Sequence, residues 1–300
     1  MNTAQPVALT AALKTYPHTA AIKDGTLNDP RVVLTCPDVE PIYRAFAPMA
    51  RQQKYDVSEM AIVTYLQAKA YGKPLIMLPT VVAARLQQAC IVYNARHRKM
   101  TVADLPGARV GVRAYSQTTG MWVRGILADT YGVPLEEVQW VSFEDSHLAE
   151  YRDPPWVRKA AAEQRMLAML EAGELDCAIF GNDLPSADGI LPLIANAAEA
   201  DSRWYQEHQL VPPNHVVVMH QDVAERHPEA LRAVYDLLKR GKAAAPPATP
   251  ANRLPTGSEA MRKALALTLD YCQRQQLLPR RLDIDEIFAD SLAILGAAGH

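Results

Sequence analysis

Hydroxyl side chains gather in one short segment of the sequence, residues 111–120. The segment is Gly111-Val-Arg-Ala-Tyr-Ser-Gln-Thr-Thr-Gly120, and it separates an apolar stretch from an amphipathic one. Ser116, Thr118 and Thr119, with the amide of Gln117, would lie at the start of a helix, where backbone N–H groups lack partners within the helix. Those groups and the helix dipole attract negative charge. One hydroxyl is enough to cap a helix, so three hydroxyls favour a binding site for an anion.

A second segment, Asp56-Val-Ser-Glu-Met60, has a similar form. Ser58 can cap the helix that is predicted to follow it, and Glu59 is favourable in the first turn of that helix. Capping alone accounts for both residues, so by itself this segment indicates structure more than a site.

Two histidines and one aromatic loop are further candidates. His147 follows a predicted strand that ends near residue 141, and His215 comes directly before an apolar strand. A single histidine is more often a structural group than a catalyst, so neither is assigned a role on these grounds alone. Tyr16 and His18 lie in a loop after the first predicted strand. Ligands of α/β proteins bind where strands end, which makes these two side chains plausible contacts.

Several classes of site have no pattern in the sequence. There is no Gly-x-Ser-x-Gly, Walker or Gly-x-Gly-x-x-Gly motif, which argues against covalent and nucleotide chemistry. The four cysteines are far apart, without metal-ligand spacing, and lie in apolar runs. We therefore expect buried thiols and no structural metal.

These candidates are positioned by an alternation of short apolar runs with helical patterns. The pattern Ile62, Tyr65, Leu66, Lys69 predicts one helix, and similar stripes begin after Thr118 and at Met166. Helical patterns also cover residues 259–275 and 283–295, whereas the proline-rich segment 243–257 predicts a surface loop or linker. Such alternation is typical of α/β layers. The predicted strands are Val7–Leu13, Val32–Thr35, Leu75–Leu78, Ala89–Tyr93, Arg109–Val112, Val138–Val141, Cys177–Phe180 and Val216–Met219.

Composition sets the scale of any ligand. The chain has 300 residues, is 49% hydrophobic, and has 31 basic against 33 acidic side chains. A nearly neutral protein has no net field for nucleic acid or an anionic membrane, so recognition should be pocket-sized. Residues 1–13 lack the pattern of an export signal, and no apolar run is long enough to span a membrane. We expect a cytoplasmic protein, and the sequence leaves a homo-oligomer open.

Two segments together resemble the second lobe of type II periplasmic solute-binding proteins. They are Leu105-Pro-Gly-Ala-Arg-Val-Gly-Val112, with the hydroxyl-rich helix start after it, and Leu170-Glu-Ala-Gly-Glu-Leu-Asp-Cys-Ala178. The resemblance implies a two-lobed α/β fold that closes around a small anion. Each lobe would be a mixed sheet flanked by helices, and two hinge crossovers, near 90–93 and 215–218, would join the lobes. Lobe 1 would combine residues 1–93 and 213–300, and lobe 2 would be residues 94–212.

Other segments resemble the 4,5-dihydroxyphthalate decarboxylase family, over residues from about 9 to about 238. They are Asp56-Val-Ser-Glu-Met-Ala61 with Tyr65-Leu66, Thr119-Gly-Met-Trp-Val-Arg-Gly-Ile-Leu127 with Tyr131-Gly132, His147-Leu-Ala-Glu-Tyr151 and Pro213-Asn-His-Val-Val-Val218. The resemblance implies non-oxidative loss of CO2 from a hydroxylated aromatic acid without a cofactor, and the sequence leaves open whether a divalent metal assists. By position it makes Ser58, Glu59, Ser116 to Thr119, Arg124, His147 and His215 pocket candidates. Among the candidates we predict catalytic roles for His215, His147 and Glu59. The predicted substrate contacts are Tyr16, His18, Ser58, Arg85, Ser116, Gln117, Thr118, Thr119, Arg124, Asn182 and Asn214; from its place along the helix alone, Arg124 would form a surface or interlobe ion pair.

One segment departs from the pattern expected of that family. Between residues 79 and 90, where relatives are expected to carry an Arg and an Arg-His pair, the chain has Arg85 in a shifted place, then Gln87 and Gln88. Glutamine cannot replace the charges that bind a carboxylate. The sequence therefore leaves open whether the substrate has two carboxylates or is a related aromatic or other small acid.

The decarboxylase hypothesis assigns an acid, a base and an anion site. His215 or His147 would protonate the carbon that loses CO2, Glu59 or Tyr16 would accept the phenol proton, and the helix start at 116–119 would hold the carboxylate. Two alternatives stay open. One is a non-catalytic binding protein that closes on a small acid by a hinge, and the other is a different enzyme on this fold, such as those of the futalosine pathway.

Overall fold

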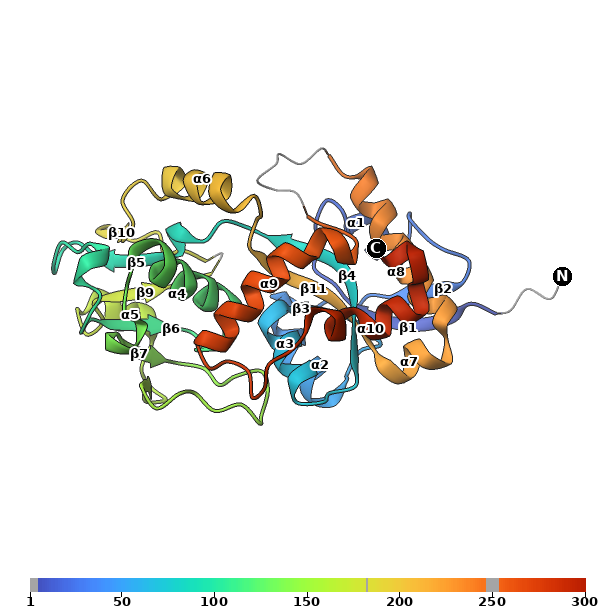
Figure 1. Ribbon diagram of the computed structural model, residues 1–300, viewed down its shortest axis with the longest axis horizontal. Helices are drawn as coiled ribbons and strands as arrows, with labels where there is room; N and C mark the ends of the chain where they lie inside the picture. Colours follow the sequence, from blue (N-terminus) through green and yellow to red (C-terminus); the bar gives the residue numbers. More distant parts are fainter. Residues whose placement is uncertain (1–4, 182, 247–253) are drawn as a thin grey trace.

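The computed structural model describes residues 5–181, 183–246 and 254–300, which form two mixed β-sheets flanked by helices (Figure 1). The first sheet has the order β2-β1-β3-β11-β4, and the second has the order β10-β5-β9-β6-β7-β8. Mixed sheets with helices around them are the predicted fold class. The strands are β1 Val7–Ala12, β2 Val32–Thr35, β3 Val57–Ala61, β4 Leu75–Ala84, β5 Ile91–Asn94, β6 Arg109–Val112, β7 Gln139–Ser142, β8 Val157–Lys159, β9 Cys177–Ile179, β10 Ile190–Pro192 and β11 Pro213–His220.

Each sheet contains one strand that is antiparallel to both of its neighbours, β11 in the first sheet and β5 in the second. β11 is antiparallel to β3 and β4, whereas β1 is parallel to β2 and β3. β5 is antiparallel to β9 and β10, whereas β6 is parallel to β7 and β9. The chain therefore passes from the first sheet to the second between β4 and β5, and returns at β11. The lobe boundaries and the hinge stay predictions.

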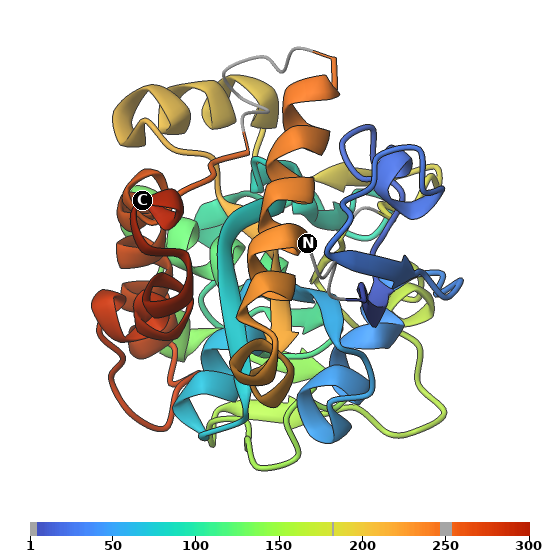
Figure 2. The same ribbon diagram turned by 90° about the vertical axis from the view of Figure 1, so that its right-hand side faces the viewer.

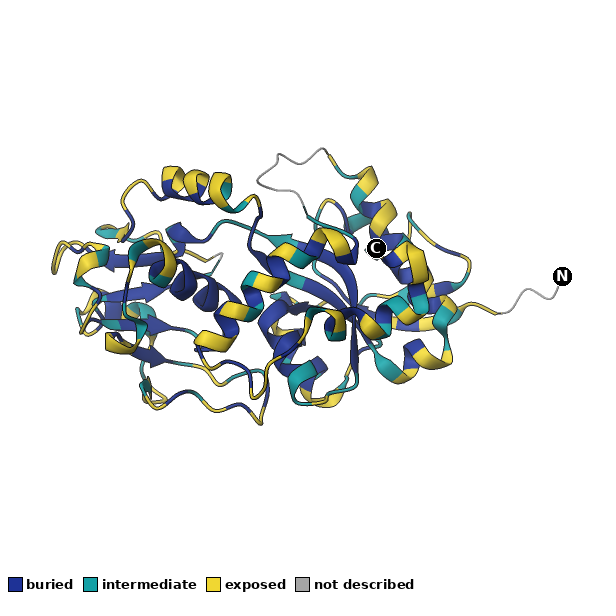
Figure 3. Cartoon of the chain, in the orientation of Figure 1, coloured by how far each residue is buried: buried dark blue, intermediate teal, exposed yellow. Residues whose placement is uncertain are grey.

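The helices cover both faces of the sheets, and their exposed residues lie on the outer surface (Figure 3). In β11, Val216 and Val218 contribute to the core on one face, and Val217 and Met219 contribute to the core on the other, beneath α8 (Figure 2). A strand that is buried on both faces appears as a continuous apolar run, which is why β11 could be recognised. The helices are α1 Ala20–Lys23, α2 Phe46–Gln52, α3 Ile62–Ala70, α4 Thr118–Tyr131, α5 Met166–Glu171, α6 Ala197–His208, α7 Gln221–Arg226, α8 Pro228–Ala244, α9 Ser258–Arg274 and α10 Ile284–Leu295.

Helix α9 spans both halves of the molecule (Figure 1). Its C-terminal half packs on α4, where the Tyr271 ring lies edge-on to Trp122 with 5.4 Å between ring centroids. Gly125 of α4 leaves room for this ring, because a Cβ there would lie 2.0 Å from the Tyr271 ring. Elsewhere α9 contacts β4 of the first sheet. The C-terminal part of the chain therefore ties the two sheets together.

The structure corrects one predicted element. Residues 57–61, predicted as the start of a helix, form the fully buried strand β3, and the helix begins only at Ile62. The cause is pairing with β1 and β11, which overrides the capping signal of Ser58. The predicted loop at 243–257 begins inside α8, which runs to Ala244, and its residues 247–253 lie outside the described part of the chain.

Two general expectations can also be compared with the structure. Cys90, Cys177 and Cys272 are buried free thiols, as predicted, whereas Cys36 is partly exposed. Within the ranges that the structure describes, no helix combines the length and apolar character needed to cross a membrane.

Candidate functional site

A buried carboxylate and a histidine form the centre of the candidate site. Glu59 on β3 and His215 on β11 lie on adjacent strands, and His215 Nδ1 is 2.6 Å from Glu59 Oε1. The Tyr16 hydroxyl donates to the same oxygen at 2.8 Å, and the Lys14 N–H donates to Oε2 at 3.0 Å. The Glu59 side chain has no exposed surface, whereas His215 is 20% exposed. The pair can thus reach a ligand only through the histidine.

The charge state of Glu59 follows from these contacts. Burial alone would raise the pKa of Glu59, but the interactions with His215, the Lys14 N–H and the Tyr16 hydroxyl outweigh it and lower that pKa. Burial and the adjacent Glu59 raise the pKa of Tyr16 well above its usual range, so Tyr16 stays a hydrogen-bond donor. An ionised Glu59 that accepts from Nδ1–H leaves His215 Nε2 for another partner.

A second histidine approaches the same place from the second sheet. His147 follows β7, and its Nδ1 is 2.7 Å from the Thr64 hydroxyl of α3. The Phe46 ring of α2 lies edge-on to both histidines, with centroid distances of 5.7 Å to His147 and 5.1 Å to His215. Burial, and then the positive charges of Arg113 and Arg51, lower the pKa of His147 to about 4. His147 is therefore a neutral imidazole at neutral pH.

The hydroxyl-rich segment adjoins this cluster but does not cap its helix with hydroxyls. Helix α4 begins at Thr118, and its N-cap residue, Gln117, makes no capping hydrogen bond with its side chain. The Thr118 hydroxyl instead accepts the Val63 N–H in the first turn of α3, at 3.3 Å. The Ser116 hydroxyl donates to the Ser146 hydroxyl at 3.1 Å. The starts of α3 and α4 thus meet, and two positive helix ends converge.

The crossover between β4 and β5 is tied to its surroundings by polar side chains. Arg85 donates to the Thr119 hydroxyl at 2.8 Å, which places this arginine at the α4 start. Gln87 donates to Asn214 Oδ1 at 2.9 Å and so links the crossover to β11. Gln88 Oε1 accepts from the Tyr131 hydroxyl at 2.5 Å. Asn182 lies outside the described residues.

Three other candidates have mainly structural contacts. Ser58 is buried in β3 and donates to the Glu59 carbonyl at 2.7 Å. His18 stacks on Tyr16 with centroids 5.0 Å apart, and burial together with Lys242 lowers the pKa of His18. Arg124 is fully buried between α4 and α9, donates to Gln275 Oε1 at 2.8 Å, and has no carboxylate partner within the described ranges. The expected surface or interlobe ion pair is therefore wrong.

Several neighbours of the site were not predicted. Phe46 and Thr64, which contact the histidines, lie in helices with ordinary patterns, and no motif singles them out. Arg113 lies inside the hydroxyl-rich segment, directly after β6, and its position at the end of a strand could have identified it. A pocket of about 330 Å³ adjoins Arg113 and Gln117.

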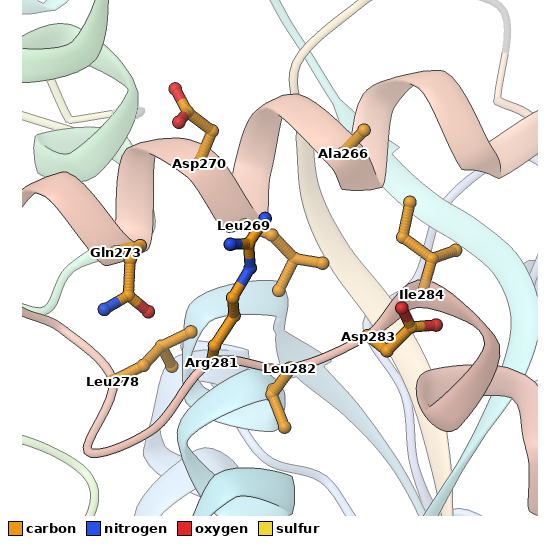
Figure 4. Close-up of a pocket in the computed structure, with 9 residues that line it drawn as sticks. All are labelled: Ala266, Leu269, Asp270, Gln273, Leu278, Arg281, Leu282, Asp283 and Ile284. Carbon is orange, nitrogen blue, oxygen red and sulfur yellow. The ribbon is translucent and has the colours of Figure 1, made fainter.

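A different pocket, of about 340 Å³, lies between α9 and the segment before α10 (Figure 4). Its walls include Asp270, Gln273 and Arg281 with apolar neighbours, and none of the histidines or their partners lines it. In the part of the chain that the structure describes, no group of three or more His, Cys, Asp or Glu side chains could hold a metal ion.

Comparison with known proteins finds two similar proteins that have the same name. No family model matches the chain. A 4,5-dihydroxyphthalate decarboxylase of Comamonas testosteroni is 28% identical over 260 residues, covering 79% of this chain and 75% of that protein. A second enzyme of that name, from Pseudomonas putida, is 28% identical over 215 residues, covering 66% and 81%. The chain is thus similar in sequence to two proteins named 4,5-dihydroxyphthalate decarboxylase.

Solved structures show the fold. The aliphatic sulphonate-binding protein SsuA of Escherichia coli superposes with a TM-score of 0.61 at 13% identity, covering 94% of this chain and 97% of that one. SsuA of Xanthomonas axonopodis, bound to MOPS, gives 0.57 at 17% identity, covering 95% and 98%. The desulfurization enzyme DSZB gives 0.52 at 14% identity, covering 96% and 99%. The predicted periplasmic-binding-protein-like fold is confirmed.

Proposed function

We propose that this protein is a decarboxylase that removes CO2 from a hydroxylated aromatic acid without a cofactor, with a substrate like 4,5-dihydroxyphthalate. The observation that carries the proposal is the Glu59–His215 pair, with Nδ1 and Oε1 2.6 Å apart, beside the neutral His147. The two sequence relatives of that name support the choice of reaction. His215 lies on β11 of the first sheet and His147 in the loop after β7 of the second, and both rings contact Phe46, so one ligand beside Phe46 could meet both.

In the proposed reaction, His215 is the acid. The C–C bond to the carboxylate breaks, its electron pair passes to the ring carbon, and that carbon takes a proton from His215 Nε2 as CO2 leaves. Glu59 stabilises the protonated imidazole and orients it through Nδ1, but is too buried to touch the substrate. Glu59 is thus a positioning residue, which changes the role that the sequence suggested for it.

His147 is assigned to the hydroxyl group of the substrate. Tyr16 stays protonated because its pKa is raised, so it has no free base to accept a phenol proton. Glu59 is too buried to reach the phenol. When His147 Nδ1–H donates to the Thr64 hydroxyl, its Nε2 is an acceptor that can bind the phenol O–H. This hydrogen bond favours electron release from the oxygen into the ring. The carboxylate that leaves would lie against the converging starts of α3 and α4.

The test is CO2 release by the purified protein from 4,5-dihydroxyphthalate and from hydroxybenzoates. We expect His215→Ala to lower kcat by about a hundredfold to ten-thousandfold, the usual contribution of a general acid. His147→Ala should lower kcat by a smaller factor. His227→Ala is the matched control, since this histidine is partly exposed, lies away from the site and pairs with Glu229. No CO2 from any of these acids with the wild type, or full activity of His215→Ala, would refute the proposal.

The second candidate is a non-catalytic binding protein for a small organic anion. Its support is the fold, which the sulfonate-binding proteins share. The two candidates differ in what happens to a bound acid: an enzyme releases it without one carboxylate, whereas a binding protein returns it unchanged. Mass spectrometry of ligand recovered from unfolded protein separates them. A cytoplasmic location belongs to the first proposal, and cell fractionation tests it.

A further inference from the structure

The loop that carries His147 joins two strands of the second sheet. It runs from the end of β7 at Ser142 to the start of β8 at Val157, and residues 143–156 form no helix or strand. A loop without ladder or helix hydrogen bonds is usually more mobile than the elements that it connects. The position of the His147 ring must therefore be set by contacts with neighbouring elements.

Arg51, in the last turn of α2, binds the backbone of this loop. Its Nε donates to the His147 carbonyl and its Nη2 donates to the Ser146 carbonyl, both at 2.7 Å. A planar guanidinium can bind two consecutive carbonyls in one fixed geometry, whereas the ammonium group of a lysine cannot. Because Arg51 is an exposed residue, these contacts are its main contribution rather than core packing.

Helix α3 binds the side chains of the same two loop residues. The Thr64 hydroxyl lies 2.7 Å from His147 Nδ1, and the Ser146 hydroxyl donates to Gln67 Oε1 at 3.3 Å. Both α2 and α3 pack against β3, the strand that carries Glu59. The loop is therefore held in a fixed relation to the strand on which the Glu59–His215 pair is built.

The charge of Arg51 also acts on the His147 imidazole. Burial, then Arg113, Arg51 and His215, lower the pKa of His147 to about 4. These three groups face the imidazole from the loop after β6, from α2 and from β11. A positive charge close to a neutral imidazole opposes its protonation.

The acidic side chains of the loop do not occupy Arg51, because each pairs with another cation. The pairs are Glu144 with Arg113, Asp145 with Lys159, and Glu150 with Lys73. Resting on the proposed function, we infer that Arg51 is a positioning residue, which holds His147 where its Nε2 can meet the hydroxyl group of the substrate. Arg51 does not touch the reacting atoms and acts through His147 alone.

Two measurements test this inference without turnover. In Arg51→Gln the pKa of His147, from NMR titration of the ring, should rise, whereas in Arg51→Lys, which keeps the charge, it should change little. Amide hydrogen exchange of residues 144–150 should become faster in both variants, because neither can bind both carbonyls. Arg44→Gln is the matched control, since Arg44 is exposed and donates to the Glu40 carbonyl of its own segment at 3.1 Å, and it should change neither quantity.

The third measurement is kcat for CO2 release. Arg51→Gln should lower kcat by about tenfold, within the range that a displaced catalytic group can lose. In the His147→Ala background the same change should have little further effect, because the two residues act as one unit.

Three outcomes would each overturn the inference: a His147 pKa that stays at the wild-type value in Arg51→Gln, loop exchange that stays at the wild-type rate, or losses of kcat that multiply in the double variant. Wild type that releases no CO2 would refute the proposed reaction instead, and the titration and exchange would still decide whether Arg51 positions His147.

Discussion

Replacing Glu59 by glutamine tests the proposed mechanism most directly. Glu59→Gln keeps the size of the side chain and removes its charge. In the structure the carboxylate accepts hydrogen bonds from the Tyr16 hydroxyl and the Lys14 N–H, and lies 2.6 Å from His215 Nδ1. A glutamine oxygen can accept only part of this set, and its NH2 group placed at Nδ1 would force the other tautomer of His215.

The size of the effect follows from the attraction between the carboxylate and the protonated imidazole. Two unit charges about 4 Å apart attract by roughly 4 kcal/mol at an effective dielectric constant of about 20. A hydrogen bond to a charged group has a net worth of about 1.5–3 kcal/mol. Since about 1.4 kcal/mol corresponds to tenfold in rate, we expect Glu59→Gln to lower kcat by about tenfold to a thousandfold.

The assay is CO2 release from 4,5-dihydroxyphthalate, with kcat and KM measured from pH 5 to 9. Because Glu59 does not touch the substrate, the loss should be in kcat more than in KM, and the pH dependence of kcat should change. Glu59→Asp keeps the charge and should restore part of the rate. Glu229→Gln, which alters an exposed His–Glu pair, is the control. A Glu59→Gln enzyme within threefold of the wild type at every pH would refute the reasoning.

Two further predictions concern stability. Burial lowers the pKa of Lys242 to about 7 from 10.5, so between these pH values the unfolded chain binds more protons and the stability contributed by Lys242 rises with pH. The melting temperature of the wild type minus that of Lys242→Met should therefore increase from pH 7 to 10; a constant difference would contradict this. Gly125→Ala should destabilise by about 1–3 kcal/mol in urea unfolding, because its Cβ meets the Tyr271 ring, although alanine favours helices. The double variant Gly125→Ala/Tyr271→Ala should lose less free energy of unfolding than the sum of the losses in the two single variants. Additive losses would argue against a clash between the new Cβ and the Tyr271 ring.

Elements with a strong local pattern could be predicted from the sequence. The strands β2 and β6 have the predicted bounds, and α4 and α10 begin within a residue or two of the predicted places. In β6, Val110 and Val112 are buried and the run ends in a polar loop, so the apolar pattern alone was sufficient.

The strand β3 could not be predicted because no local signal specifies it. Its residues include Ser58 and Glu59, which favour a helix start, yet the strand is held by β1 and by β11, whose residue His215 is 156 positions from Glu59. Pairing over such a separation overrides local preference. The same pairing brings Glu59 to His215, so the sequence could supply the two residue types but not their contact.

The missing charges at Gln87 and Gln88 illustrate a different limit. That comparison assumed that a carboxylate must be bound from the segment that carries the charges in relatives. Other charged side chains can lie near a site without being singled out by a sequence motif, as Arg113 does in the loop after β6, over the Tyr43 ring and in the wall of a pocket. In this chain the two glutamines instead hydrogen-bond to Asn214 and to the Tyr131 hydroxyl. For this chain, the number of carboxylates on the substrate has to be inferred from all the side chains around the site.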